Sequence, residues 1–188
     1  MNFQMVSIVL LTGFLISLSA WAEMPLIPRT GQTSSYAVGD DGALQKGVAW
    51  PTPRFTDNSN GTLTDNLTGL IWPTAANCFG LQTWSAALTD ATSLASGSCS
   101  LSDGSNAGTW RLPNRKELKS LIDLQQKDNA AWLTSVGFTK PPSDYPYWSS
   151  STVANNNTYA WRVNLLNGYV SSDSKLNKGY VIPVRGGN

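Results

Sequence analysis

The chain has 188 residues, and its 13 basic and 12 acidic residues leave a net charge of +1. This length fits one domain with a short extension. A nearly neutral chain without long runs of charge is not typical of a nucleic-acid-binding protein. The sequence contains no histidine, which excludes Ser-His-Asp and Cys-His catalysis and any zinc site that uses histidine.

The N-terminal segment has the features of an export signal. Residues 6–18 form an apolar run too short for a comfortable membrane span, and Ala20-Trp21-Ala22 follows as a cleavage pattern. We therefore expect residues 1–22 to be a signal peptide. The mature chain, with no membrane span, would be exported to the periplasm, the cell surface or the medium. An uncleaved anchor or a buried strand is the alternative.

Proline and glycine dominate residues 23–47, which predicts a leader or linker ahead of a domain at 48–188. The domain contains two cysteines, Cys78 and Cys99. An even pair in an exported chain favours a disulfide. Two free thiols remain the alternative, because the sequence does not give the distance between the two residues.

Strands are predicted in two groups. The fragment TDNSNG at 56–61 recurs as TDNLTG at 64–69, which indicates three short strands joined by turns at Asn60-Gly61 and Thr68-Gly69. Four further strands are predicted at 147–150, 159–165, 169–170 and 180–184, with a turn at Asn167-Gly168.

Two helices are predicted. The first covers 83–95, where Thr83 can act as the N-cap and apolar residues recur near the helical period. The second follows a short strand at 109–112 and begins at Asn114, with Glu117 completing a capping box. The pattern as a whole indicates a loop-rich α+β domain with one disulfide and two helices packed outside short antiparallel sheets.

The densest cluster of basic residues is Arg111, Arg115, Lys116 and Lys119, of which the last three have no assigned structural role. Such residues could bind the sulfate or carboxylate groups of an anionic polysaccharide. The alternative interpretation is a solvated helix face on which Lys119 pairs with Asp123.

Aromatic side chains of the C-terminal half could stack on sugar rings, although alternation along strands also favours core packing for most of them. These residues are Tyr145, Tyr147, Trp148, Tyr159, Trp161 and Tyr169.

Carboxylates do not form a convincing catalytic or metal site. Glu117 and Asp123 would lie on different faces of the helix, so no catalytic residue is predicted. Asp57 and Asp65 lie in the repeated turns and could offer oxygen ligands to Ca²⁺, but the order of residues does not match an EF-hand loop. Acidic residues in such turns more often bond their own backbone, and we expect no other cofactor or metal.

Five motifs occur in a fixed order: TDNLTGLIW at 64–72, TWRLPNRKEL at 109–118, YWSSS at 147–151, AWRV at 160–163 and YVIPVRGG at 180–187. Together they resemble the C-terminal domain of the Legionella collagen-like adhesin and its family of secreted bacterial domains. The RLP-x-x-x-EL and VRGG motifs are also similar to those of formylglycine-generating and diversified C-type-lectin-like proteins. The resemblance implies a C-type-lectin-like fold.

The resemblance further implies an exported adhesion module that binds a glycosaminoglycan-like polysaccharide or a protein, and Arg115, Lys116 and Lys119 are the candidate contacts. It does not imply the oxygenase chemistry of formylglycine-generating enzymes, whose reactive cysteines lie late in the domain. Cys78 and Cys99 both precede the RLP motif. A structural or assembly role in the cell envelope is the alternative, an enzyme is a more remote one, and the sequence does not indicate an oligomeric state.

Overall fold

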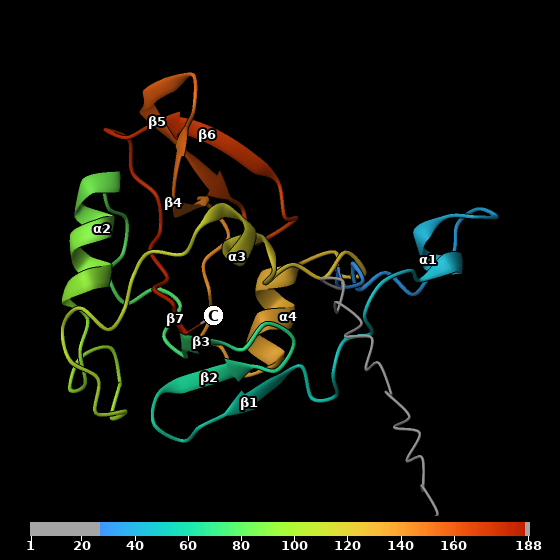
Figure 1. Ribbon diagram of the computed structural model, residues 1–188, viewed down its shortest axis with the longest axis horizontal. Helices are drawn as coiled ribbons and strands as arrows, with labels where there is room; N and C mark the ends of the chain where they lie inside the picture. The colour runs from blue at the N-terminus through green and yellow to red at the C-terminus, as the bar shows by residue number, and fades with distance from the viewer. Residues whose placement is uncertain (1–26, 187–188) are drawn as a thin grey trace, which may run out of the picture.

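The computed structural model describes residues 27–186, so the predicted signal peptide at 1–22 lies outside the described residues. The described chain forms two antiparallel sheets and four short helices (Figure 1). In chain order the elements are α1 (Asp41–Leu44), β1 (Phe55–Asp57), β2 (Thr62–Asp65), β3 (Leu70–Pro73), α2 (Trp84–Ser93), α3 (Arg115–Lys119), α4 (Asn129–Ser135), β4 (Tyr147–Val153), β5 (Asn156–Val163), β6 (Val170–Ser174) and β7 (Arg185–Gly186).

The repeated TDN fragments form the predicted meander of three strands. β1, β2 and β3 pair in sequence order, with Leu63 opposite Trp72, and β7 adds to the free edge of β3. Gly61 ends the turn before β2 at a φ of +82°. A Cβ atom there would also collide with the carbonyl oxygen of Ser100, so the turn requires glycine.

The second sheet has the order β4-β5-β6, and the strands predicted around 147–150 and 159–165 belong to it. The regular strands predicted at 109–112 and 180–184 are wrong. Both segments are extended, but they pair only through isolated bridges, one between Arg111 and Val184 and one between Tyr147 and Tyr180. Pro113 and Pro183 lack the N–H groups that a continuing ladder needs.

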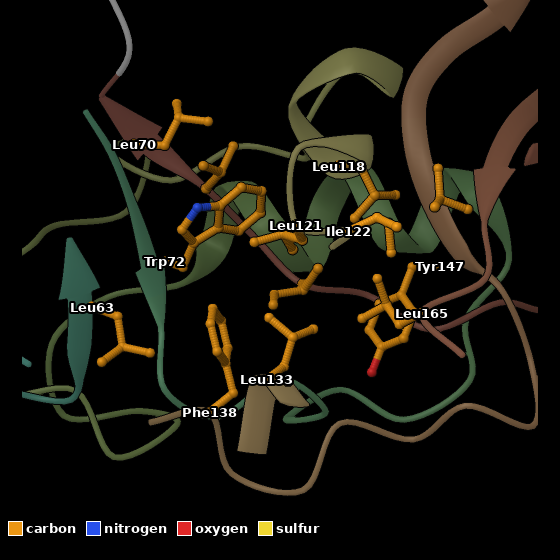
Figure 2. Close-up of a cluster of buried hydrophobic side chains, with 14 of the residues drawn as sticks. Leu63, Leu70, Trp72, Leu118, Leu121, Ile122, Leu133, Phe138, Tyr147 and Leu165 are labelled. Atoms are coloured by element: carbon orange, nitrogen blue, oxygen red, sulfur yellow. The ribbon is translucent and has the colours of Figure 1, made fainter. Parts of the chain in front are cut away.

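One hydrophobic core joins both sheets to α3 and α4, which lie between the sheets in Figure 1. Figure 2 shows Trp72 of β3, Leu118 of α3, Leu133 of α4 and Tyr147 of β4 converging on this core, and all four are fully buried. α2 lies to one side, where Ala87 and Ala91 pack in a second cluster with Trp148.

The helices partly match the expectation. α2 begins after Thr83, whose hydroxyl accepts a hydrogen bond from the N–H of Ala86 at 3.4 Å. α3 ends at Lys119, earlier than expected. α1 and α4 were not predicted, since helices of four and seven residues are too short to show a clear period. The class is α+β, as predicted.

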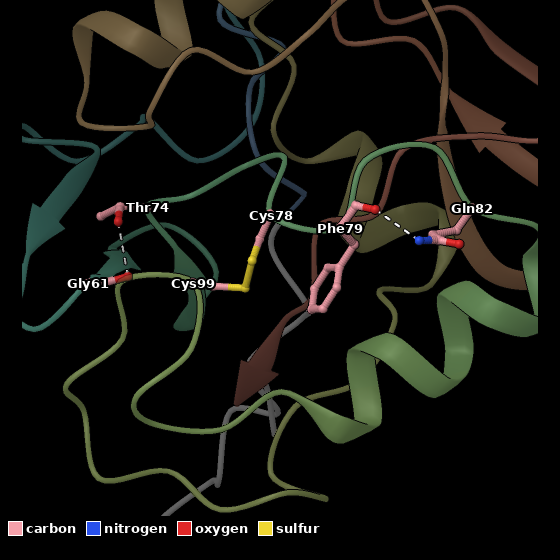
Figure 3. Close-up of a disulfide and its surroundings, with 6 residues drawn as sticks. All are labelled: Gly61, Thr74, Cys78, Phe79, Gln82 and Cys99. Atoms are coloured by element: carbon pink, nitrogen blue, oxygen red, sulfur yellow. Dashed lines mark hydrogen bonds between the residues drawn. A yellow bond between two sulfur atoms is a disulfide. The ribbon is translucent and has the colours of Figure 1, made fainter.

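The disulfide between Cys78 and Cys99 is present, with 5.5 Å between the two Cα atoms. It ties the loop after β3 to the long loop after α2 (Figure 3). Beside it, the N–H of Thr74 donates to the carbonyl oxygen of Gly61 at 2.9 Å. The cross-link joins the two loops, and the N–H of Ser102 ties the second loop to the turn before β2 by donating to the carbonyl oxygen of Asn60 at 2.9 Å.

The segment expected to be a leader or linker makes defined contacts where the structure describes it. The N–H of Leu124 donates to the carbonyl oxygen of Thr30 at 3.0 Å, and the side-chain oxygen of Gln125 accepts from the N–H groups of Thr33 and Ser34. Trp50 stacks near Trp132 of α4 at 5.9 Å between ring centroids. These contacts hold residues 30–34 against the segment that follows α3, and Trp50 against α4.

Candidate functional site

α3 carries the candidate basic residues, and its start is fixed by the predicted capping box. The side-chain oxygen of Asn114 accepts from the N–H groups of Lys116 and Glu117, and the Glu117 carboxylate accepts from the N–H of Asn114 at 2.7 Å. The N–H of Arg115 donates to the Ser151 hydroxyl of β4 at 3.0 Å. The short helix is therefore held in one orientation against the second sheet.

Arg111 and Glu117 neutralise each other. Both terminal nitrogens of Arg111 donate to the carboxylate, at 2.7 and 2.6 Å. Burial would raise the pKa of Glu117, but hydrogen bonds from Arg111 and from the backbone of Asn114 outweigh this effect and hold the pKa below its ordinary 4.5. Neither residue is free to bind a ligand.

Arg115 and Lys116 lie on the accessible side of α3. The guanidinium of Arg115 lies 4.6 Å from the ring centroid of Trp161 on β5, within cation–π range. With Asn114 and Ser151, these three residues line a pocket of about 320 Å³, which we call the Trp161 pocket. The pocket thus combines two cations with the face of an indole ring.

Lys119 does not pair with Asp123, so the pairing in the alternative interpretation is wrong. Its ammonium donates to the carbonyl oxygen of Gly168 at 2.7 Å, and burial lowers its pKa. Asp123 is buried and accepts from the N–H of Gln125 and the side-chain amide of Gln126. Among residues 27–186, no ion pair includes Arg115, Lys116 or Lys119.

A larger pocket of about 580 Å³ adjoins the same helix, and we call it the apolar pocket. Arg115 and Lys116 line both pockets, so the two pockets adjoin each other along α3. One wall comes from the early segment and the other from α3, the residues after it and β6. The lining is Ile27, Pro28, Arg29, Thr30, Trp50, Leu67, Arg115, Lys116, Lys119, Ser120, Ile122, Leu124 and Val170.

The aromatic set divides between the core and the surface. Tyr147 and Trp148 are fully buried, whereas Tyr145, Tyr159 and Tyr169 are exposed. Trp161, partly exposed, is the member of the set that stands beside the basic cluster. A ligand can therefore reach the ring of Trp161, whereas the rings of Tyr147 and Trp148 are inaccessible to it.

Asp57 and Asp65 lie apart in the meander. Asp65 pairs opposite Phe55, while Asp57 pairs opposite Leu63. Asp65 is fully buried and accepts from Arg54 through both carboxylate oxygens at 2.7 Å. No group of three or more histidine, cysteine, aspartate or glutamate side chains suited to a metal occurs within 27–186. Calcium near Asp57 and Asp65 stays a prediction.

The order and content of the motifs can now be compared with known families. Residues 61–185 match the family model described as the Lcl C-terminal domain. The chain belongs to this family. A comparison with curated proteins finds none that matches.

The Lcl C-terminal domain is a non-catalytic domain associated with a surface adhesin. The matched residues include the disulfide, α3 and Trp161. Helices long and apolar enough to cross a membrane do not occur in the part of the chain that the structure describes. The predicted module class is therefore confirmed at the level of an adhesin-associated domain.

The three basic residues predicted as ligand contacts line the apolar pocket, but sequence reasoning missed Trp50, Arg29 and the rest of its early wall. These residues precede the match to the Lcl C-terminal domain. Their proline- and glycine-rich surroundings resemble those of a linker, and no periodic signal marks them. Their position is set by tertiary contacts, such as the bond from the indole N–H of Trp50 to the carbonyl oxygen of Arg29 and the contact of Trp50 with Trp132.

Proposed function

We propose that the chain is an exported, non-catalytic binding module for an anionic polysaccharide. The single observation that carries the proposal is the row of Arg115, Lys116 and Lys119 along α3, which make no ion pair among the described residues, with Trp161 beside the first two. Sulfate and carboxylate groups would accept hydrogen bonds from these cations, and a sugar ring would lie close to the indole.

The geometry favours an extended ligand over a compact one. Arg115 and Lys116 line both the Trp161 pocket and the apolar pocket. Of these two pockets, Lys119 lines the apolar pocket alone. A chain with repeated anionic groups can meet all three cations along the helix. Because the accessible cations are few, binding would be of modest strength and would weaken as salt screens the charges.

Heparin chromatography across a salt gradient tests the proposal. We expect the purified chain to be retained at low salt and Arg115→Ala/Lys116→Ala to bind about tenfold more weakly, since two charge-assisted contacts are lost. The matched control is Lys140→Ala/Lys178→Ala, which removes the same charge from two exposed residues outside both pockets.

Equal loss in both double variants would mean that net charge, and not this site, governs retention. No retention on heparin or on an anionic glycan array would overturn the proposal. A stable complex with an envelope protein in place of glycan binding would instead favour the assembly role.

A further inference from the structure

The apolar pocket has a chemical character that an anionic polysaccharide does not match. Besides its cations it presents a largely hydrocarbon wall, made by Ile27, Trp50, Leu67, Ile122, Leu124 and Val170. Polysaccharides carry hydroxyl groups on nearly every carbon and would bury little apolar surface against such a wall. The size, about 580 Å³, lies in the range of small-molecule sites, about 300–1,000 Å³.

Part of this apolar wall faces solvent. Leu124 is 49% exposed and Ile27 is 79% exposed, and both lie on the pocket. Exposed apolar side chains that gather around a concave site mark a place where burial by a ligand is favourable. Their neighbours Ile122 and Val170 continue the same surface inward.

The charges around this wall have one sign. Four cations line the pocket, namely Arg29, Arg115, Lys116 and Lys119, and none of its lining residues is acidic. None of the four joins an ion pair among residues 27–186. Lys119 is partly buried, and within residues 27–186 its side chain bonds only to the carbonyl oxygen of Gly168. An anion beside it would offset the cost of desolvating its charge.

We propose that the apolar pocket binds a free, single-chain amphiphile with an anionic head, of the fatty-acid type. The alkyl chain lies against Trp50, Leu67 and Leu124, and the head accepts hydrogen bonds from the cations of α3. This ligand class lies beyond the proposed polysaccharide function. The two ligands would share Arg115, Lys116 and Lys119, and only the amphiphile requires the apolar wall.

Isothermal titration of the purified chain with monomeric carboxylates tests the pocket. Decanoate should bind roughly tenfold more tightly than octanoate, because two more methylenes are buried. Decyltrimethylammonium, with the same chain and a cationic head, should bind at least tenfold more weakly than decanoate. Equal affinity for decanoate and octanoate, or for decanoate and decyltrimethylammonium, would overturn the proposal. Both comparisons use the unaltered chain, so neither depends on whether a variant folds.

Variants of the wall locate the site. Leu67→Asn/Leu124→Asn should weaken decanoate binding roughly tenfold or more by removing apolar contacts. The matched control Leu44→Asn/Leu176→Asn changes two exposed leucines that do not line the pocket and should bind as the unaltered chain does. Equal effects of the two pairs would overturn this placement of the ligand.

Two further outcomes separate the amphiphile from other ligands. Binding to phosphatidylglycerol vesicles without binding to monomeric decanoate would overturn the proposal in favour of a membrane surface. Retention of Leu67→Asn/Leu124→Asn on heparin, together with loss of decanoate binding, supports two ligands on one helix. Failure of decanoate to bind at all would leave the polysaccharide proposal standing and remove this one.

Discussion

The Glu117 side chain has two structural roles, one in the cap of α3 and one in an ion pair. Its carboxylate closes the capping box of α3 and also accepts both terminal nitrogens of Arg111. Arg111 in turn donates to the carbonyl oxygen of Gly186 at 3.3 Å. One side chain thereby connects the start of α3 to β7, far along the sequence.

Replacing Glu117 tests this link and its dependence on pH. We expect Glu117→Gln to lower the free energy of unfolding by about 1 kcal/mol at pH 7, because the ion pair with Arg111 is lost and the bond to the N–H of Asn114 becomes a neutral one. The pKa of Glu117 is lowered in the folded chain. The stabilisation is therefore complete above pH 4.5 and disappears as the pH falls through the folded pKa.

Urea unfolding between pH 7 and about pH 2.5 measures the effect. The two unfolding curves should converge at the acid end. Lys116→Gln, an exposed neighbour that makes no ion pair among the described residues, serves as the control and should show no such convergence. A difference that stays constant over the pH range would contradict the role assigned to the Glu117 carboxylate.

Sequence reasoning worked best at this scale. The roles of Thr83, Asn114 and Glu117 follow from contacts within four residues, and short-range rules describe such contacts well. The predicted pairing of Lys119 with Asp123 was wrong because the acceptor of Lys119, the carbonyl oxygen of Gly168, lies 49 residues away along the chain. No local pattern indicates a lysine bonded to a distant turn.

At the scale of elements, the turn between β5 and β6 touches α3 closely. Gly168 has a φ of +71°, and a Cβ atom on it would lie 2.7 Å from Cγ2 of Ile122 and 2.8 Å from Nζ of Lys119. The end of the lysine can move away, but Ile122 is buried and cannot. The turn is therefore packed too tightly against Ile122, three residues beyond the end of α3, for any larger residue.

A pair of glycine substitutions separates this packing from backbone strain. Gly69 has nearly the same φ, +70°, but no atom lies within 4 Å of its would-be Cβ. We expect Gly69→Ala to cost about 1 kcal/mol, and Gly168→Ala to cost about 1–2 kcal/mol more because of the contact with Ile122. Urea unfolding of both variants measures the difference, and equal costs would show that the turn and α3 are not tightly packed.

Elements were predictable where strands follow one another in the chain. The meander of β1, β2 and β3 was predicted because its turns carry Asn-Gly and Thr-Gly signals and its pairing is local. The segments 109–112 and 180–184 have equally suitable residues, yet each finds only isolated bridges. Whether an extended segment becomes a strand depends on a partner that distant parts of the chain supply.

At the scale of the whole molecule, the disulfide closes a loop with a sequence separation of 21. The loop contains α2 and leads into the Ser/Gly-rich segment, part of which packs through Leu94, Leu101 and Trp110 in a small cluster that also touches Cys99. Such a small cluster has little capacity to order a long loop by itself. The cross-link therefore limits how far this loop can unfold.

Removing the disulfide should have a measurable cost. Cys78→Ala/Cys99→Ala should lower the free energy of unfolding by about 3 kcal/mol, through the entropy that the unfolded chain regains. Heparin binding should persist under native conditions, because neither pocket includes a residue of the disulfide. Unchanged stability in urea would mean that other contacts, such as the one from Ser102 to Asn60, already hold the loop.

The apolar pocket has one wall from the family domain and another from the segment before residue 61. Residues outside the matched domain therefore help to shape a pocket whose cations come mostly from α3 inside it. A domain with the same α3 and another leading segment would present the same three cations of α3 beside a different wall. Exchanging residues 27–50 should therefore change which ligand the pocket prefers.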